Sequence, residues 1–399
     1  MERKKILVIN CGSSSLKYDV IAMPDNQSLG NGIVERIGSK SGKLTQKVNG
    51  EKLIFEEEIA DHTKAFKLMM KALLYDNKGI ITSLEDIDGV GHRTVHAGED
   101  YASSVVITED VVKSINRNIN LAPLHNPANL TGIAEAQKMF PNITHVGVFD
   151  TAFHQTMPKQ AYMYAIPKEL YNNLGVRKYG FHGTSHRYVS NIAYEKYNID
   201  RNSSGIVSCH LGNGASICAI ENGISIDTSM GMTPLEGLIM GTRSGDLDPG
   251  IVFFLHENGY SFDEINNILN NKSGLLGLSG ISNDLRDIED AAIEGSKFAQ
   301  CALNAYAYRI AKYIGGYSAA LVKVNAIIFT GGVGENDVII REKVCNKLRS
   351  IGINFDAIRN IELNRKEGVI SAEESLTKII IIPTNEELQI AKDTYELIS

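Results

Sequence analysis

Residues 206–220 read IVSCHLGNGASICAI and contain two short apolar runs separated by a glycine-rich turn. The turn includes an Asn-Gly pair, Asn213-Gly214, which is a strong hairpin signal between β-forming runs. Because glycines carry no side chain, such a turn also lets an oxyanion approach unpaired backbone N–H groups. On its own, the segment fits either a plain hairpin or a phosphate-binding one.

The same pattern occurs near the N-terminus, where residues 6–20 read ILVINCGSSSLKYDV. A third glycine cluster, TGGVGEN at residues 330–336, follows an apolar run and precedes a helix-like segment. Two such hairpins and a strand–glycine–helix turn resemble the layout of the actin, sugar kinase and Hsp70 superfamily. The resemblance implies an α/β fold of two duplicated actin-like (ribonuclease H-like) domains with a cleft between them.

No low-complexity linker marks a domain boundary, so we place it near Asp150, where the duplicated pattern begins again. The N-terminal actin-like domain is expected to cover residues 1–150 and the C-terminal one residues 151–383. Thr384-Asn385-Glu386-Glu387 is typical of a helix start with acids in its first turn. We expect this final segment, residues 384–399, to return to the first domain.

Composition excludes several classes of function. The 399 residues carry a formal charge of −7, whereas nucleic acids and anionic membranes require a broad basic surface. The five cysteines are odd in number and form no CxxC pair, so we expect buried apolar residues in a reducing compartment. With neither an 18-residue apolar run nor a signal-peptide pattern, the chain is expected to be cytoplasmic.

Two arginines lie in polar segments of opposite halves. Arg93 ends an apolar strand-like run, and Arg243 lies in a glycine-flanked loop. The planar guanidinium group holds a carboxylate or phosphate through two hydrogen bonds. Either arginine alone fits a surface ion pair, but the two together favour anion binding.

His182 and His186 are four residues apart and would share one face of a helix, where they could chelate a metal. Gly183 weakens the helical interpretation. We therefore favour one histidine as a hydrogen-bond donor to a phosphoryl group, with a purely structural pair as the alternative.

Three oxygen-bearing side chains, Asn10, Asp150 and Glu386, lie at ends of predicted strands or at a helix start. A sparse oxygen set suits Mg²⁺, with Mn²⁺ as an alternative, because Mg²⁺ keeps most of its waters and takes other ligands from nucleotide phosphates. Asp246 and Asp248 form a rival acidic pair, although Asp248 before Pro249 also fits a helix cap. The chain contains no P-loop, HRD or HExxH motif, and its glycines do not match a dinucleotide-binding fingerprint.

Several further segments are similar to the signatures of the acetate kinases, and together they cover residues 6 to about 394. These are VINCGSSSLK (8–17), APLHNP (122–127), FDTAFH with Met157-Pro158 (149–158), YGFHGTSH (179–186), DTSMGMTPLEG (227–237), FTGGVGEN (329–336) and TNEE (384–387). The resemblance implies reversible phosphoryl transfer between ATP and acetate, giving ADP and acetyl phosphate, by a homodimer that associates through its C-terminal domain.

The resemblance also implies a role for each matching residue. Arg93, Arg243 and His182 would hold the carboxylate and the transferred phosphoryl group, while Asp150, with the metal ligands Asn10 and Glu386, would position Mg²⁺. The pocket for the methyl group would be formed by Val95, Leu124, Phe181 and Pro234. Nucleotide contacts are expected from Lys17, His210, Leu211, Gly212, Asn213, Gly214, Asp284, Leu285, Arg286, Gly331, Gly332, Val333, Gly334, Glu335 and Asn336.

Two alternatives stay open at this level. A propionate or butyrate kinase of the same family would differ only by small changes in the pocket. A non-catalytic nucleotide switch such as actin or Hsp70 shares the layout, but it would not need two arginines and an apolar pocket. Repeats and coiled-coil heptads, which would favour a scaffolding protein, are absent from the sequence.

Overall fold

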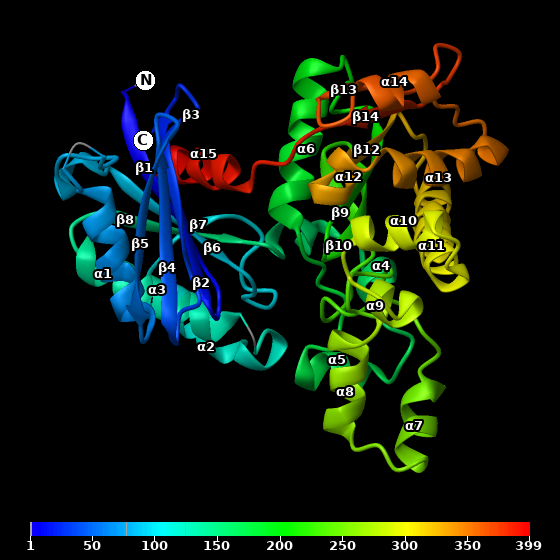
Figure 1. Cartoon of the computed structure of the whole chain (residues 1–399), viewed down its shortest axis with the longest axis horizontal. Helices are drawn as coiled ribbons and strands as arrows, with labels where there is room; N and C mark the ends of the chain where they lie inside the picture. The colour runs from blue at the N-terminus through cyan, green and yellow to red at the C-terminus, as the bar shows by residue number, and fades with distance from the viewer. Residues whose placement is uncertain (1, 77, 124) are drawn as a thin grey trace. The chain divides into compact units, whose positions relative to one another are not determined.

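The computed structural model describes residues 2–76, 78–123 and 125–399, and the chain divides into two compact units. Unit 1 comprises Met1–Gln155 and Asn385–Ser399, and unit 2 comprises Thr156–Thr384. Each unit is built around its own β-sheet (Figure 1).

In the described part of unit 1, the strands form an eight-stranded sheet with the order β5-β4-β3-β2-β1-β6-β8-β7. The strands are β1 (Lys4–Cys11), β2 (Ser15–Met23), β3 (Gln27–Glu35), β4 (Ser39–Val48), β5 (Glu51–Ile59), β6 (Gly89–Thr94), β7 (Val105–Val106) and β8 (Thr144–Phe149). The helices are α1 (His62–Leu73), α2 (Glu109–Arg117), α3 (Asn126–Met139) and α15 (Glu386–Ile398).

Strand β1 is apolar on both faces because helices cover both sides of the sheet. Leu7 and Ile9 pack with α1 and α3, where Phe66 and Phe140 complete one core. Ile6 and Val8 face the other way and pack against α15. The C-terminal helix therefore forms part of unit 1, beside β1, β6 and β8 (Figure 1).

In the described part of unit 2, the sheet has six strands in the order β11-β10-β9-β12-β14-β13. The strands are β9 (Gly205–Leu211), β10 (Ala215–Glu221), β11 (Ile224–Thr228), β12 (Ala326–Thr330), β13 (Gly368–Val369) and β14 (Lys378–Ile381). The helices are α4 (Lys159–Tyr162), α5 (Lys168–Leu174), α6 (Gly183–Lys196), α7 (Gly250–Glu257), α8 (Phe262–Asn271), α9 (Gly274–Ser279), α10 (Leu285–Ile293), α11 (Lys297–Ala320), α12 (Gly331–Asn336), α13 (Val338–Leu348) and α14 (Ala357–Glu362). Helices α6 and α11 both pack on this sheet (Figure 1).

The two sheets share one topology, which confirms the predicted fold class. The order β3-β2-β1-β6-β8 in unit 1 corresponds to β11-β10-β9-β12-β14 in unit 2. In both, three antiparallel strands are followed by two strands that run parallel to the first. The glycine turns after β1 and β9 therefore occupy equivalent positions, as a duplicated actin-like fold requires.

Some local predictions need correction. The Asn126-Pro127 pair is typical of a helix start with the asparagine as the cap, but α3 already contains Asn126, and His125 is the N-cap. All five cysteines are free, and four are buried as expected, whereas Cys301 is exposed on α11. In the described ranges, no helix combines the length and the apolar character that a membrane span needs.

Candidate active site

Unit 1 brings together one arginine and three oxygen-bearing side chains. Arg93 lies near the end of β6, and Asp150 directly follows β8, the strand parallel to β6. Asn10 lies near the end of β1, and Glu386 is the first residue of α15. Because parallel strands end at the same edge of a sheet, residues distant in sequence meet there.

The arginine and Asp150 form a two-pronged ion pair. Arg93 Nη2 lies 2.5 Å from Asp150 Oδ2, and Nε donates to Oδ1 at 3.2 Å. Arg93 Nε is also 3.6 Å from Glu386 Oε2, and Nη1 donates to Asn10 Oδ1 at 3.4 Å. One guanidinium group thus contacts all three predicted oxygen ligands.

The charges of this group are strongly coupled. Burial alone would lower the pKa of Arg93, but Asp150 and Glu386 outweigh it, and the pKa rises. Burial raises the pKa of Asp150 and of Glu386, although Arg93 opposes both shifts. The arginine therefore stays charged, and its charge partly offsets the effect of burial on the two carboxylates.

These residues suit a hard divalent cation. In the described ranges, no group of three or more His, Cys, Asp or Glu side chains could hold a metal ion. Two carboxylates and an amide oxygen would leave most positions around Mg²⁺ for water or phosphate, which is how Mg²⁺ is commonly bound. Lys17, predicted to contact nucleotide, lies in unit 1, where its charge lowers the pKa of Glu386.

In unit 2, His182 stands at the start of α6 in a left-handed backbone conformation, with φ of 57°. Such a conformation is uncommon for a residue other than glycine and tends to occur where function requires it. His182 Nδ1 lies 3.0 Å from Ser216 Oγ, and its ring stacks on His210 at 4.3 Å between centroids. The histidine is therefore held on one side by a hydroxyl group and on one face by a second imidazole.

His186 is linked to His182 through a serine hydroxyl. Its Nε2 lies 2.8 Å from the same Ser216 hydroxyl, and its Nδ1 lies 2.9 Å from Ser208 Oγ. Both ring nitrogens are thus engaged by serines. The distances favour the hydrogen-bonding role over the chelate alternative, because the two histidines are joined through the Ser216 hydroxyl.

Arg243 lies close to His182 over the glycine turn between β9 and β10. A Cβ atom placed on Gly214 would lie 3.6 Å from His182 Nε2 and 3.7 Å from Arg243 Nη1. Unlike Arg93, Arg243 has no carboxylate in ion-pair distance among the described residues, and only Pro234 O at 3.5 Å and Met240 Sδ at 3.9 Å accept from Nη1. Burial lowers its pKa. An anion would supply the missing partner.

The rival acidic pair has structural roles. Asp246 accepts a hydrogen bond from Gly237 N at 2.8 Å and another from the Tyr313 hydroxyl at 2.8 Å. Asp248 accepts from Gly250 N at 2.9 Å, at the start of α7. Neither carboxylate belongs to the group around Arg93.

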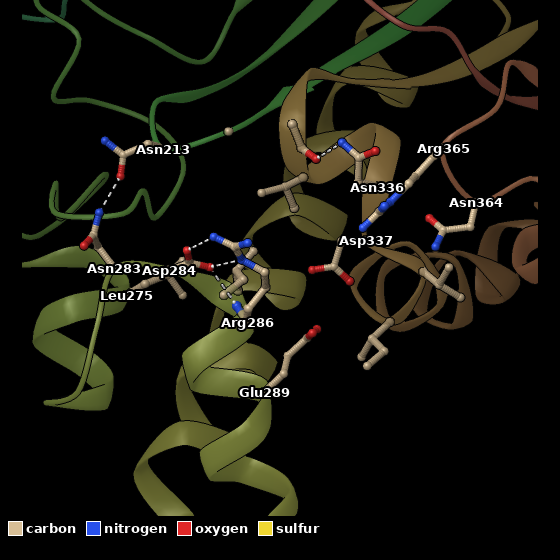
Figure 2. A pocket seen from close by; sticks show the side chains of 16 residues that line it. Asn213, Leu275, Asn283, Asp284, Arg286, Glu289, Asn336, Asp337, Asn364 and Arg365 are labelled. Carbon is tan, nitrogen blue, oxygen red and sulfur yellow. Dashed lines mark hydrogen bonds and ion pairs between the residues drawn. The ribbon is translucent and has the colours of Figure 1, made fainter. Parts of the chain in front are cut away.

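A cavity of about 740 Å³ borders the same glycine turn within unit 2 (Figure 2). Its size falls in the range of small-molecule sites. It is lined by Gly212, Asn213, Leu275, Asn283, Asp284, Leu285, Arg286, Glu289, Gly332, Val333, Asn336, Asp337, Val338, Ile339, Asn364 and Arg365. Asn283 donates to Asn213 Oδ1 at 3.0 Å and so joins the glycine turn to the start of α10.

Eight of the fifteen residues predicted to contact nucleotide line this cavity. The backbone of Gly331 has φ of +76° and passes so close to Leu211 that a side chain would not fit. The remaining predicted residues, which do not line it, are Lys17, His210, Leu211, Gly214, Gly331, Gly334 and Glu335.

Glu335 does not line the cavity and instead binds backbone N–H groups. Its Oε1 accepts from Gly331 N at 2.9 Å and from Thr384 N at 3.0 Å. Thr384 is the last residue of unit 2 before the chain continues into α15. Glu335 therefore fixes the glycine loop to this crossing point, a role that the local motif did not reveal.

The predicted methyl-pocket residues are divided between the units. Val95 follows β6 in unit 1 and is buried, while Phe181 and Pro234 belong to unit 2, where Phe181 is buried. Leu124 lies outside the described residues. The predicted set therefore stays a prediction.

Sequence reasoning missed several residues at these sites. Ser216 and Ser208 hold His182 and His186 through their hydroxyl groups. Asn283 and Asp337 line the cavity. His125 lowers the pKa of Asp150 through its charge. His125 falls in a segment already noted for its resemblance, so that segment offered a signal. The serines lie in apolar strands and offered none.

Comparison with known proteins shows the family of the chain. Residues 5–392 match the model of the acetokinase family. The acetate kinase of Clostridium botulinum (strain Hall) is 53% identical over 394 residues, covering 98% of this chain and 99% of that protein. The crystal structure of Porphyromonas gingivalis acetate kinase superposes with a TM-score of 0.95 at 50% identity, covering 99% of this chain and 100% of that one.

A propionate kinase from Francisella tularensis is also similar, with a TM-score of 0.92 and 44% identity over 99% of this chain and 100% of that one. The family match extends over nearly all residues described above and includes both glycine hairpins. The chain belongs to the acetokinase family.

Proposed function

We propose that this protein is an acetate kinase, which transfers a phosphoryl group reversibly from ATP to acetate and gives acetyl phosphate and ADP. The observation that carries the proposal is the pairing of Arg243 and His182 over a glycine turn that also borders a nucleotide-sized cavity. Arg243 lacks a carboxylate partner there, so it is available to a transferred phosphoryl group. Phosphoryl transfer depends mainly on alignment and on stabilising the charge of the equatorial oxygens.

The acceptor needs no general base. A carboxylic acid with a pKa near 4 is ionised at neutral pH, so its oxygen can attack directly. We assign Arg93 to the acceptor carboxylate and Arg243 to the phosphoryl group, with His182 Nε2 as a further donor. Direct in-line transfer is the simplest route, whereas a phosphorylated Glu386 would be the covalent alternative.

We further propose that Asn10, Asp150 and Glu386 hold Mg²⁺, or Mn²⁺ in its place. When bound, the cation supplies positive charge that neutralises the nucleotide phosphates. The protein's own contribution is the positive charge of Arg93, which favours the ionised forms of Asp150 and Glu386 against the effect of burial. Asp150 would thus serve both as the partner of Arg93 and as one of the residues that hold the cation.

The acid substrate is assigned to a pocket formed by Val95, Leu124, Phe181 and Pro234. A propionate or butyrate kinase is the second candidate, and the likeness to the F. tularensis propionate kinase favours keeping it. A methyl pocket discriminates only modestly against one extra methylene, by about 10- to 200-fold. Direct comparison of the acids therefore decides between them.

The deciding experiment traps acyl phosphate with hydroxylamine after incubation with Mg-ATP and acetate, propionate or butyrate in parallel. The strongest signal with acetate supports an acetate kinase. A stronger signal with a longer acid retains the mechanism and changes the substrate. Bound nucleotide without any acyl phosphate would favour a nucleotide switch and contradict the proposal.

A homodimer formed through unit 2 is also proposed, as the family resemblance implies. Phe253 and Phe254 on α7 are 63% and 64% exposed, and Phe262 on the next helix is also exposed. Neighbouring exposed aromatic side chains often mark a protein interface. Light scattering of the intact protein and of Phe253→Asp would test this, with a monomeric wild type contradicting it. A cytoplasmic location likewise remains a proposal.

A further inference from the structure

The turn that carries Pro234 is closed by a tyrosine from outside it. The Tyr164 hydroxyl accepts a hydrogen bond from Met232 N at 3.0 Å and donates a short one to the carboxylate of Glu236. Met232 and Glu236 flank Pro234 on either side. One hydroxyl group therefore joins both ends of the turn, which we call the 232–236 turn.

The carboxylate packs directly on the backbone of the same turn. A Cβ atom on Gly231 would overlap both Glu236 Oε2 and the Tyr164 hydroxyl, so a larger residue there would displace these two side chains. Gly231 O in turn accepts from Tyr179 N at 3.1 Å and from Gly180 N at 3.2 Å. These two residues immediately precede Phe181, so the turn also positions the segment that carries this second pocket residue.

The turn is linked to the transfer arginine as well. Arg243 Nη1 donates to Pro234 O at 3.5 Å, and this is one of the few contacts that orient its guanidinium group. Asp246 fixes the end of the turn, because its carboxylate accepts a hydrogen bond from Gly237 N at 2.8 Å. The same carboxylate forms an ion pair with Arg309, with Nη1 at 3.4 Å. A shift of Pro234 would therefore move a pocket wall and release Arg243 together.

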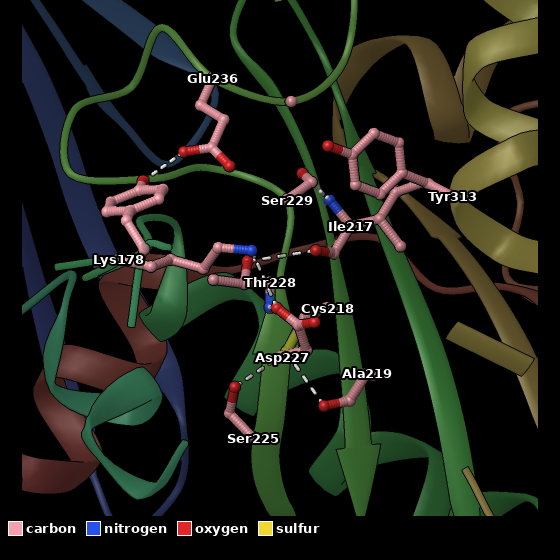
Figure 3. A network of polar contacts seen from close by, with 12 residues as sticks. Lys178, Ile217, Cys218, Ala219, Ser225, Asp227, Thr228, Ser229, Glu236 and Tyr313 are labelled. Carbon is pink, nitrogen blue, oxygen red and sulfur yellow. Dashed lines mark hydrogen bonds and ion pairs between the residues drawn. The ribbon is translucent and has the colours of Figure 1, made fainter. Parts of the chain in front are cut away.

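The Glu236 carboxylate depends on the Tyr164 hydroxyl as its hydrogen-bond donor. Burial raises the pKa of Glu236, while Tyr164 and Lys178 lower it, and Asp246 and Asp227 raise it further. Lys178 is itself bound to Asp227, at 3.1 Å (Figure 3). Lys178 acts on Glu236 only through its charge, whereas the Tyr164 hydroxyl donates a hydrogen bond to it directly. Loss of that donor would leave a partly buried carboxylate poorly satisfied.

We propose that Tyr164 and Glu236 are positioning residues that set the selectivity for the chain length of the acid by holding Pro234 against the substrate pocket. The inference rests on the proposed function, because it takes Pro234 as a wall of the acid pocket. Neither residue contacts the reacting atoms. Their effect would appear in the choice of acid and not in the binding of nucleotide.

The test compares Tyr164→Phe, Glu236→Ala and Glu236→Gln in the full-length protein. Tyr197→Phe is the matched control, since its hydroxyl donates to Glu367 at 3.1 Å on the surface of unit 2, far along the chain from the turn. Two quantities are measured: the ratio of kcat/KM for propionate to that for acetate, and amide hydrogen exchange in the peptide covering residues 230–237. KM for ATP is recorded alongside.

In Tyr164→Phe and Glu236→Ala we expect the propionate-to-acetate ratio to rise by about fivefold to tenfold, because a loosened wall tolerates an extra methylene. Exchange in the 230–237 peptide should become about tenfold faster, with KM for ATP unchanged. Glu236→Gln should stay close to wild type, because an amide oxygen still accepts from Tyr164.

An unchanged acid ratio in folded Tyr164→Phe and Glu236→Ala would overturn the selectivity role. Unchanged exchange would overturn the hydrogen-bonded closure itself, and it needs no enzymatic activity. If Tyr164→Phe fails to fold, Glu236→Ala decides by the same two measurements. Absence of acyl phosphate from the wild-type protein would instead overturn the proposed function and the selectivity role with it.

Discussion

Arg93 and Arg243 are assigned to the same reaction, yet their surroundings predict different consequences when each is replaced by alanine. Arg93 is the direct ion-pair partner of Asp150, a carboxylate that is only 2% exposed. Removing one partner of a buried ion pair typically costs about 3–5 kcal/mol of stability. Arg243 has no such partner among the described residues, so Arg243→Ala should change stability by less than about 1 kcal/mol.

Activity should fall in both variants. Each loses a donor to charge that develops in the transition state, so kcat/KM should drop by about two to four powers of ten. Urea unfolding measures the stability of each variant, and hydroxylamine trapping measures its activity. Arg359→Ala is the matched control, because Arg359 pairs with Asp356 and Glu373 on the surface, where an ion pair contributes about 0–1 kcal/mol.

Two results would contradict these expectations. Near-normal activity of Arg243→Ala would show that Arg243 does not take part in the reaction. A stability of Arg93→Ala equal to that of the control variant would mean that Asp150 does not depend on its ion pair. Stability loss in Arg93→Ala with activity loss in both is the pattern that the two environments predict.

Three more predictions concern selectivity, loop anchoring and pH. Val95→Ala should improve propionate relative to acetate by about tenfold in kcat/KM, and an unchanged ratio would remove Val95 from the pocket. Glu335→Ala should raise KM for ATP by about tenfold, because Gly331 N and Thr384 N lose their hydrogen-bond acceptor. Glu335→Gln keeps an acceptor oxygen and should leave KM unchanged. Equal KM values in the two variants would contradict this. His92 Nε2 and His145 Nδ1 lie 2.9 Å apart, and burial lowers the pKa of both histidines. Below about pH 6.5 the unfolded chain therefore binds more protons than the folded one. The free energy of unfolding should then fall as pH decreases, by up to about 1.4 kcal/mol per pH unit for each histidine. The urea midpoint of His145→Gln should depend less on pH between about 7.5 and 5.5 than that of wild type, and equal slopes would contradict this.

Local sequence patterns predicted the elements of the fold well because hairpins and caps depend on neighbouring residues. The turns after β1 and β9 followed from glycine, asparagine and serine between apolar runs. Asp61 and Thr108 cap α1 and α2, and residues of these types are common at helix starts. Repetition of the hairpin then led to the duplicated fold, which the two sheets confirm.

The candidate site could be predicted only in part. Arg93, Asp150 and Glu386 come together because strand ends and a helix start meet at one sheet edge. The sequence did not indicate the direction of each side chain. Glu335, for example, accepts a hydrogen bond from Thr384 N and does not line the cavity. The contact between Tyr164 and Glu236 joins residues far apart in sequence, so no local pattern could indicate it.

The most direct test of the central claim uses the reverse reaction. The purified protein is given acetyl phosphate and Mg-ADP, and ATP is measured with luciferase, with Arg243→Ala and a metal-free sample in parallel. The proposed function predicts ATP formation that requires the divalent cation and is almost abolished in Arg243→Ala. Absence of ATP with the wild-type protein, or equal ATP with Arg243→Ala, would contradict the account.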